Sequence, residues 1–245
     1  MINEMGNLMK RGFVNKTILM GAFCILVLGC GRFGMAEDYE PERDYESGAD
    51  EDIFKEPAYP DYLVLVNKEH PLPDGWEEGI DIIEMTNSRG NVVEIESTAY
   101  EAFLELQYEL TLEGVSIDLD NAYRSVSEQE WLVDTFTEKY GEGYVEQYVA
   151  VPGYSEHHTG LALDLYLIVD GEEMYYNEEL TEKPEVWEIV HNNLADYGFI
   201  LRYPEGKEEI TGYSYEPWHI RYVGVDAAQQ MMWQGLTLEE YMGEA

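Results

Sequence analysis

Three of the five histidines lie in two short strings whose residue types suit a metal-dependent hydrolase. The first string holds His157, His158 and Asp164, and the second holds Glu216 and His219. A hydrolytic zinc ion needs three protein ligands, an open position for water and a general base near that water. Imidazoles, an aspartate and a separate glutamate supply that set. The two strings therefore predict a site for one zinc ion per domain.

The surroundings of Asp164 favour a cation. It lies in the apolar run 160–169, where an unpaired carboxylate is costly unless it binds a metal or a partner. His157 and Asp164 are seven positions apart, so one regular strand would direct them to opposite faces. We therefore expect the chain to bend between them, at Thr159-Gly160. On the residues alone, His158 could replace His157 as a ligand.

The second string argues against a helical zinc motif. Pro217 biases Glu216 toward an extended conformation, and the chain contains no HExxH pattern. The only cysteines, Cys24 and Cys30, precede the rest of the chain, so neither disulfides nor thiolate ligands are expected beyond them. No serine is followed three residues later by lysine, which argues against a serine peptidase of the penicillin-binding type.

Helices and strands are mixed without a repeating βαβ order, which favours an α+β fold for the part of the chain that holds the two strings.

Ser97 and Ser127 are candidate N-caps, and His70 and His191 are expected at the surface. Arg202 and Arg221 are expected to pair with acids. The patterns predict strands over 62–66, 160–169 and 218–223, helices over 97–113, 127–140 and 184–197, and a short helix near the C-terminus.

The first 29 residues are typical of an export signal or membrane anchor. Lys10, Arg11 and Lys16 precede the apolar run 18–28, which is short for a membrane span. Val27-Leu28-Gly29-Cys30 is similar to a bacterial lipoprotein cleavage box, in which Cys30 would be lipidated. An uncleaved anchor and full secretion are the alternatives. The chain is therefore expected outside the cell, attached to the membrane and facing the cell wall.

The segment 30–57 is expected to be an acidic, disordered linker. Nine acids and one base lie between Glu37 and Asp52, and such dense like charge prevents burial. A binding tail is the alternative. The folded domain is expected over 58–245. The formal net charge of −37 disfavours nucleic acid and anionic lipid as partners. A monomer is expected.

The two strings together match a known pattern. S-x-H-x-x-G-x-A-x-D followed by E-P-W-H resembles the signature of the VanY-type D-alanyl-D-alanine carboxypeptidases, a zinc peptidase family of the M15B type. The similarity covers about residues 60–225, including 65–72, Tyr123-Arg124-Ser125, 148–154 and 197–204. Asn121 departs from the family, whose members usually carry a small residue there. The resemblance implies one compact domain with a central antiparallel sheet flanked by helices.

The resemblance also implies roles for individual residues. His157, Asp164 and His219 would bind zinc, which decides for His157 over His158, and Glu216 would be the general base on the zinc-bound water. Arg124 would contact the scissile carbonyl or the substrate carboxylate. Gln129 and Ser155 would be further substrate contacts. The implied reaction is removal of the terminal D-alanine from peptidoglycan stem peptides ending in D-Ala-D-Ala.

Three alternative functions remain open. Relatives with the same zinc ligands are L,D-carboxypeptidases that act on the tetrapeptide, and the motifs do not separate the two specificities. An endopeptidase that cuts within the wall peptide is the second. The third is a non-catalytic zinc-binding or wall-binding module, against which Glu216 argues, because a binding domain needs no base beside the metal.

Overall fold

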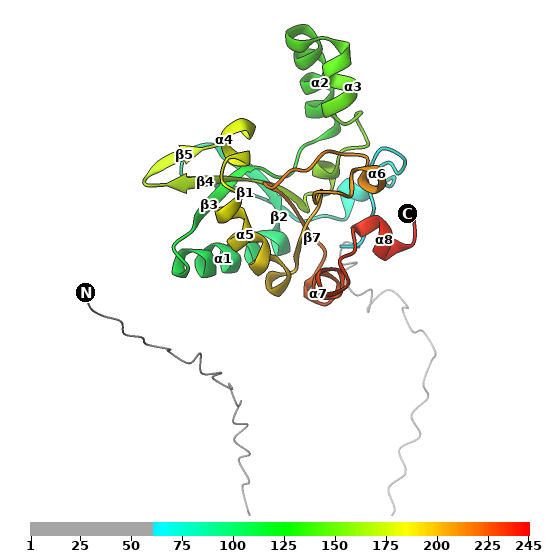
Figure 1. Cartoon of the computed structure of the whole chain (residues 1–245). Helices are drawn as coiled ribbons and strands as arrows, with labels where there is room; N and C mark the ends of the chain where they lie inside the picture. The colour runs from blue at the N-terminus through cyan, green and yellow to red at the C-terminus, as the bar shows by residue number, and fades with distance from the viewer. Residues whose placement is uncertain (1–60) are drawn as a thin grey trace, which may run out of the picture. The chain divides into compact units, whose positions relative to one another are not determined.

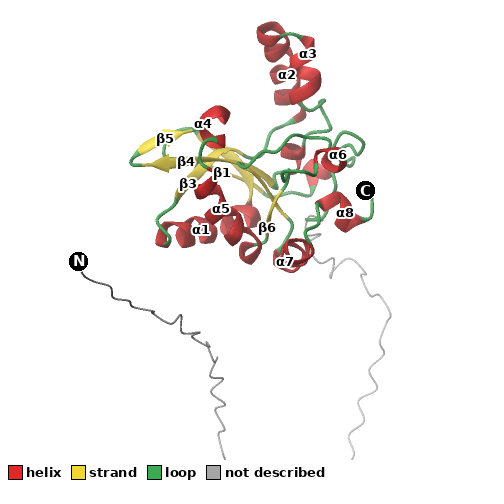
Figure 2. Ribbon diagram, viewed as in Figure 1, coloured by secondary structure: helices red, strands yellow, loops and turns green. Residues whose placement is uncertain are grey.

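The centre of the fold is an antiparallel sheet. The structure is a computed structural model that describes residues 61–245, without the side chains of Gln147 and Tyr148. Strands β3 (Ser116–Asn121), β4 (Ala162–Val169), β7 (His219–Tyr222) and β6 (Phe199–Leu201) lie in that order, and β5 (Glu172–Met174) pairs with β4. All these pairings are antiparallel. The expected α+β class and antiparallel sheet are confirmed (Figure 2).

A separate hairpin precedes the sheet. Strands β1 (Ile82–Thr86) and β2 (Val92–Glu96) pair with each other, and the amide oxygen of Asn87 accepts from the backbone N–H groups of Arg89 and Asn91 in the turn. The sequence patterns above do not predict this hairpin. The turn-rich segment 87–91 between two apolar runs was the available signal.

Helices cover the sheet because their apolar faces need a partner. In α1 (Ser97–Leu112), Phe103, Leu106 and Leu110 recur at helical spacing and all are fully buried. Helix α5 (Pro184–Asn193) buries Trp187 beside it and continues as the 3-10 turn η3 (Leu194–Tyr197) until Gly198. The chain ends with α7 (Val225–Gln234) and α8 (Leu238–Met242), the helical ending that was expected. None of the helices among residues 61–245 is both long and apolar enough to cross a bilayer.

The helices α2 (Val126–Tyr140) and α3 (Glu142–Tyr148) form a pair that stands away from the sheet (Figure 1). Phe136 contacts Tyr140 and Tyr144 edge-on, with ring centroids 5.6 and 6.3 Å apart. The remaining short elements are η1 (Trp76–Glu78), η2 (Glu156–Thr159), α4 (Asn177–Thr181) and α6 (Glu208–Thr211).

Three local predictions were wrong. Residues 62–66 form a turn and irregular chain rather than a strand, because the carbonyls of Tyr62 and Val64 accept from the Arg221 side chain. Helix α2 is capped by Ser125 with Glu128, not by Ser127, and Glu96 rather than Ser97 caps α1. In both helices the cap is the residue whose backbone is still extended. The predictions for residues 1–57 lie outside the described residues.

Candidate metal centre and active site

Two ligand candidates face each other across neighbouring strands. Asp164 on β4 and His219 on β7 are direct partners in the antiparallel register. The Nδ1 atom of His219 lies 2.8 Å from Asp164 Oδ1, and His157 Nε2 lies 3.1 Å from Asp164 Oδ2. Among residues 61–245, these three side chains form the group able to hold a metal ion, with ligand atoms within 4.8 Å of one another.

The bend expected between His157 and Asp164 is present. His157 lies in η2, and Gly160 ends that turn with φ of 73°, a left-handed conformation that glycine adopts without strain. A Cβ atom at Gly160 would also lie 2.8 Å from the Ile82 side chain. The bend therefore brings His157 to the same side of the sheet as Asp164.

The backbone selects which nitrogen of His157 faces the cluster. Its Nδ1 lies 2.7 Å from the Ala122 carbonyl oxygen, which can only accept, so Nδ1 carries the proton. The Nε2 lone pair is then free on the side of Asp164. The Asn121 amide lies 3.1 Å from the same Nδ1, so the unusual residue at this position packs behind the ligand candidate.

His158 has a different place. Its Nδ1 donates to the Arg124 carbonyl oxygen at 2.6 Å, and its Nε2 accepts from the Gly153 backbone N–H at 3.1 Å. Both ring nitrogens of His158 therefore form hydrogen bonds with backbone groups and do not face Asp164. The geometry brings His157, and not its neighbour, into the cluster.

The electrostatics of the cluster suit a cation. Burial lowers the pKa of His157, which keeps its imidazole neutral. Burial alone would raise the pKa of Asp164, but His157 and His219 outweigh it and hold that pKa well below its usual value. Burial also opposes a charge on His219, yet hydrogen bonds with Asp164 and Glu156 raise its pKa to about 10. Two nitrogens, a carboxylate and a preference for positive charge fit a zinc ion.

Glu216 is separate from this group and lines the same cavity. It lies outside any helix, just before a turn at Pro217, as the argument against a helical motif predicted, and its backbone N–H donates to the Tyr203 carbonyl oxygen at 3.2 Å. Burial raises the pKa of its carboxyl to about 7; Asp164 adds to the shift and His219 opposes it. A carboxyl group with a pKa near neutrality can take up and release a proton.

His191 differs from its prediction as a surface residue. Its ring stacks on Trp187 and is half-buried, with Nε2 2.9 Å from the Pro217 carbonyl oxygen. Because that carbonyl can only accept, Nε2 donates. His191 thereby holds the loop that carries Glu216.

Arg124, Gln129 and Ser155 line the same cavity as Glu216. The cluster of His157, Asp164 and His219, the metal-type cluster, lines it as well. The Arg124 Nη1 group donates to Gln129 Oε1 at 2.8 Å, and Gln129 Nε2 donates to the Ala150 carbonyl oxygen at 2.7 Å. Gln129 therefore orients Arg124. Burial lowers the pKa of Arg124, but a guanidinium stays charged at any physiological pH.

The cavity has a volume of about 280 Å³ and two chemically different sides. The cluster, Glu216 and Arg124 form the polar side. Leu132 and Phe136 of α2, together with Tyr144 of α3, contribute an apolar side. A ligand with an apolar part and an acidic group would match that division.

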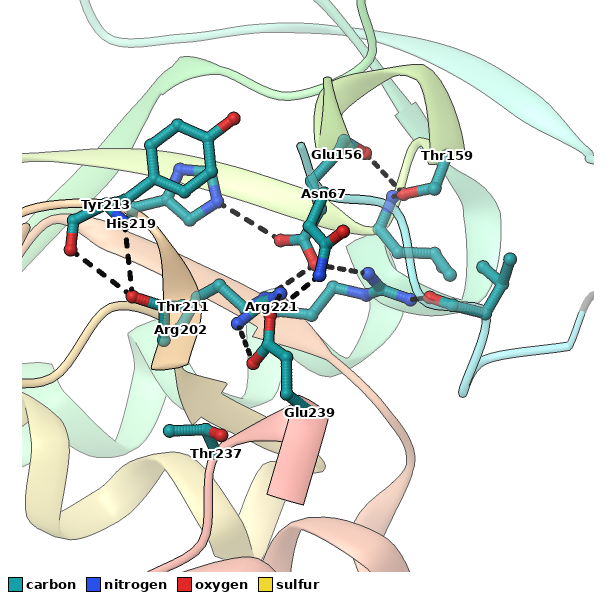
Figure 3. Close-up of polar contacts among 12 residues, drawn as sticks. Asn67, Glu156, Thr159, Arg202, Thr211, Tyr213, His219, Arg221, Thr237 and Glu239 are labelled. Carbon is teal, nitrogen blue, oxygen red and sulfur yellow. Dashed lines mark hydrogen bonds and ion pairs between the residues drawn. The ribbon is translucent and has the colours of Figure 1, made fainter. Parts of the chain in front are cut away.

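A buried ionic network behind the cluster was not foreseen in full. Glu156 Oε1 accepts from Arg202 Nε at 2.6 Å and from Arg221 Nη1 at 2.8 Å (Figure 3). The pairing of both arginines with acids was expected, but the role of Glu156 was missed. The position of this acid directly before His157 was the available signal.

This geometry defines an α+β domain with a His₂Asp cluster and a nearby carboxyl group, the class of site found in metal-dependent hydrolases. Comparison with known proteins identifies the family. The sequence model of the family described as "VanY: D-alanyl-D-alanine carboxypeptidase" matches residues 92–225. The chain belongs to this family.

Relatives and solved structures agree with that assignment. A D-alanyl-D-alanine carboxypeptidase of Enterococcus faecalis is 36% identical over 74% of this chain, which spans 65% of that relative. The bifunctional D-Ala-D-Ala dipeptidase and carboxypeptidase VanXYC of Enterococcus gallinarum is 34% identical over 73% of this chain and 92% of its own length.

Two solved structures share the fold. The D,D-pentapeptidase VanY from a VanB-type resistance cassette, solved as a mutant in complex with Zn(II), matches with a TM-score of 0.61 and 35% identity, over 74% of this chain and 98% of its own. The LD-carboxypeptidase LdcB matches with a TM-score of 0.65 and 36% identity, over 75% of this chain and 86% of its own.

Proposed function

We propose that this chain is a zinc-dependent carboxypeptidase that removes the terminal D-alanine from peptidoglycan stem peptides ending in D-Ala-D-Ala. The observation that carries the proposal is one cavity lined by the His157, Asp164 and His219 cluster together with Glu216 and Arg124. The Zn(II) complex of the related VanY enzyme supports zinc as the metal.

His157 Nε2, an Asp164 oxygen and His219 Nδ1 would hold the ion. When bound, zinc polarises a carbonyl group and lowers the pKa of its water toward about 7. Glu216 accepts the proton of the attacking water and passes it to the leaving amine, so that D-alanine departs as a neutral amine. Arg124 grips the terminal carboxylate of the substrate with its guanidinium fork, and Gln129 keeps that fork oriented.

Arg124 thus separates an exopeptidase from an endopeptidase. Replacing Arg124 with alanine is expected to lower kcat/KM for a free-carboxylate peptide by about 100-fold, or ~3 kcal/mol, because a charge-assisted contact is lost. Peptides with an amidated C-terminus are expected to change less than about fivefold. Arg124→Lys keeps the charge without the fork and should recover only part of the loss. Equal losses on amidated and free peptides would contradict the carboxylate anchor.

A second specificity is favoured by one finding. LdcB, whose structure aligns with a TM-score of 0.65, is described as an LD-carboxypeptidase. The test is to incubate the purified protein, with zinc, with a pentapeptide and a tetrapeptide and to identify the products by mass. Release of D-alanine from the pentapeptide supports the D,D assignment. Release from the tetrapeptide alone would replace it with the L,D assignment.

The pH dependence of catalysis tests the base. Burial raises the pKa of Glu216 to about 7, and a cation bound nearby would lower it, because it favours the ionised form. Since only the ionised carboxylate accepts a proton, kcat/KM is expected to fall as the pH drops through an apparent pKa at or below about 7. The measurement is a pH profile of kcat/KM at constant zinc and ionic strength. A flat profile between pH 4 and 8 would contradict the assignment of Glu216.

We further propose that the enzyme works outside the cell, held at the membrane through a lipid on Cys30 or through an uncleaved anchor. The basic and apolar pattern of the first 29 residues supports this. Metabolic labelling with a palmitate analogue, compared between the wild type and Cys30→Ala, tests the lipid. A wild-type protein that incorporates no label would contradict lipidation.

A further inference from the structure

The C-terminal helix α8 is connected to the metal-type cluster by one continuous line of buried charges (Figure 3). Glu239 on α8 contacts Arg202, Arg202 contacts Glu156, and Glu156 contacts the ligand candidate His219. The three charged side chains of that line are no more than 3% exposed. Because water does not reach these side chains, the charge of each must be compensated by its partners within the protein.

The two carboxylate oxygens of Glu156 have different partners. Both arginines donate to Oε1, while Oε2 lies 3.4 Å from His219 Nε2. Because His219 Nδ1 faces Asp164, its Nε2–H is the group that points to Glu156. A carboxylate behind a metal-binding histidine fixes the ring orientation and raises the basicity of the ligand. Glu156 can do this only while Oε2 is not taken by an arginine.

Glu239 keeps Oε2 available. The two terminal nitrogens of Arg202 donate to Glu239 at 2.9 and 2.6 Å, in a paired contact that satisfies the fork. Asn67 Nδ2 donates to Glu239 Oε1 at 3.2 Å and holds that carboxylate from the other side. Without the charge of Glu239, the guanidinium of Arg202 has one strong acceptor nearby, which is Glu156. It would then compete with His219 for that carboxylate.

We propose that Glu239 is a positioning residue for the metal centre: by satisfying Arg202, it leaves Glu156 to orient His219. The inference rests on the proposed zinc site and adds to it a control of metal affinity by the C-terminal helix. Loss of a partner of this kind typically lowers metal affinity by about 10- to 100-fold. For Glu239→Gln, one contact further from the metal, we expect the lower limit, about tenfold.

The test is a zinc titration of the full chain after metal removal, in competition with a chromophoric chelator. Glu239→Gln is compared with the wild type and with Glu240→Gln, a matched control on the same helix. Glu240 pairs with Lys207 at 2.8 Å and forms the capping box of α8 with Thr237, without touching Arg202. A zinc dissociation constant raised about tenfold in Glu239→Gln, and within about twofold of the wild type in Glu240→Gln, supports the proposal.

Other outcomes overturn it. Equal affinity of Glu239→Gln and the wild type would show that Arg202 does not compete for Glu156. Equal weakening in both variants would show that docking of α8, rather than the charge of Glu239, is responsible. If Glu239→Gln does not fold, Glu239→Asp, which keeps the charge and shortens the reach, should still weaken zinc binding, and unchanged affinity in that variant would reject the inference. A wild-type chain that binds no zinc would instead reject the metal site on which the inference rests.

Discussion

Replacing Glu216 with glutamine is expected to lower kcat by about 10³-fold while the bound zinc stays at the wild-type level. Glutamine has nearly the same shape, so the cavity and the backbone contact with Tyr203 remain. It cannot accept a proton, so the attacking water loses its base. The measurements are the steady-state rate on the preferred stem peptide and the zinc content of the purified variant.

A nearby acid provides the control for this variant. Glu205 is exposed on the loop after Tyr203, so Glu205→Gln removes the same charge without touching the cavity. Its rate is expected within about twofold of the wild type. If Glu216→Gln kept its rate, the proposed base would be wrong. If it lost its zinc as well, the carboxyl group would be part of the metal site instead.

Replacing Glu156 with glutamine is expected to lower the free energy of unfolding by about 3 kcal/mol, at the lower end of the range for breaking a buried ion pair. Glu156 is 3% exposed and compensates both Arg202 and Arg221, which are fully buried. The amide keeps one acceptor oxygen but removes the charge, so Arg202 is left with Glu239 as its carboxylate and Arg221 with backbone carbonyls alone. Chemical denaturation of the metal-free wild type and variant measures the difference.

An exposed pair of the same length shows why burial matters. Arg89 Nη1 lies 2.6 Å from Asp120 Oδ1, the same distance as Arg202 Nε from Glu156 Oε1, but the Asp120 side chain is 43% exposed. Water screens such a pair, so Asp120→Asn is expected to cost less than about 1 kcal/mol. Equal effects at both sites would contradict the idea that the buried network carries the stability.

The few basic side chains of the chain include three that lie at or behind the site. The chain has 51 acidic and only 14 basic side chains, yet Arg202 and Arg221 lie fully buried behind the cluster, and Arg124 lines the cavity. Positive charge thus lies at Arg124, where a peptide carboxylate would bind, and a carboxylate lies at Asp164, where a metal would bind.

The chemistry of the site could be predicted from the sequence because it depends on residue types. Histidines and acids in two short strings indicated a zinc site, the odd spacing of His157 and Asp164 required a bend, and Pro217 argued against a helical Glu216. The structure has the bend at Gly160, and Glu216 lies outside any helix. These features are local, so the chain within a few residues decides them. The assignment of the ligands, the base and Arg124 to their roles stays a prediction.

Only the tertiary structure decided how distant segments meet. The register of β4 and β7 places Asp164 opposite His219, 55 residues away, and the Ala122 carbonyl orients His157 while Arg124 and Gly153 engage His158. The role of Glu156 depends on arginines 46 and 65 residues further along the chain. The strand expected over 62–66 failed for the same reason, since its carbonyls bind Arg221 instead of a neighbouring strand. Periodicity and motif spacing describe a segment by itself, whereas partners for a buried charge are set by packing between segments.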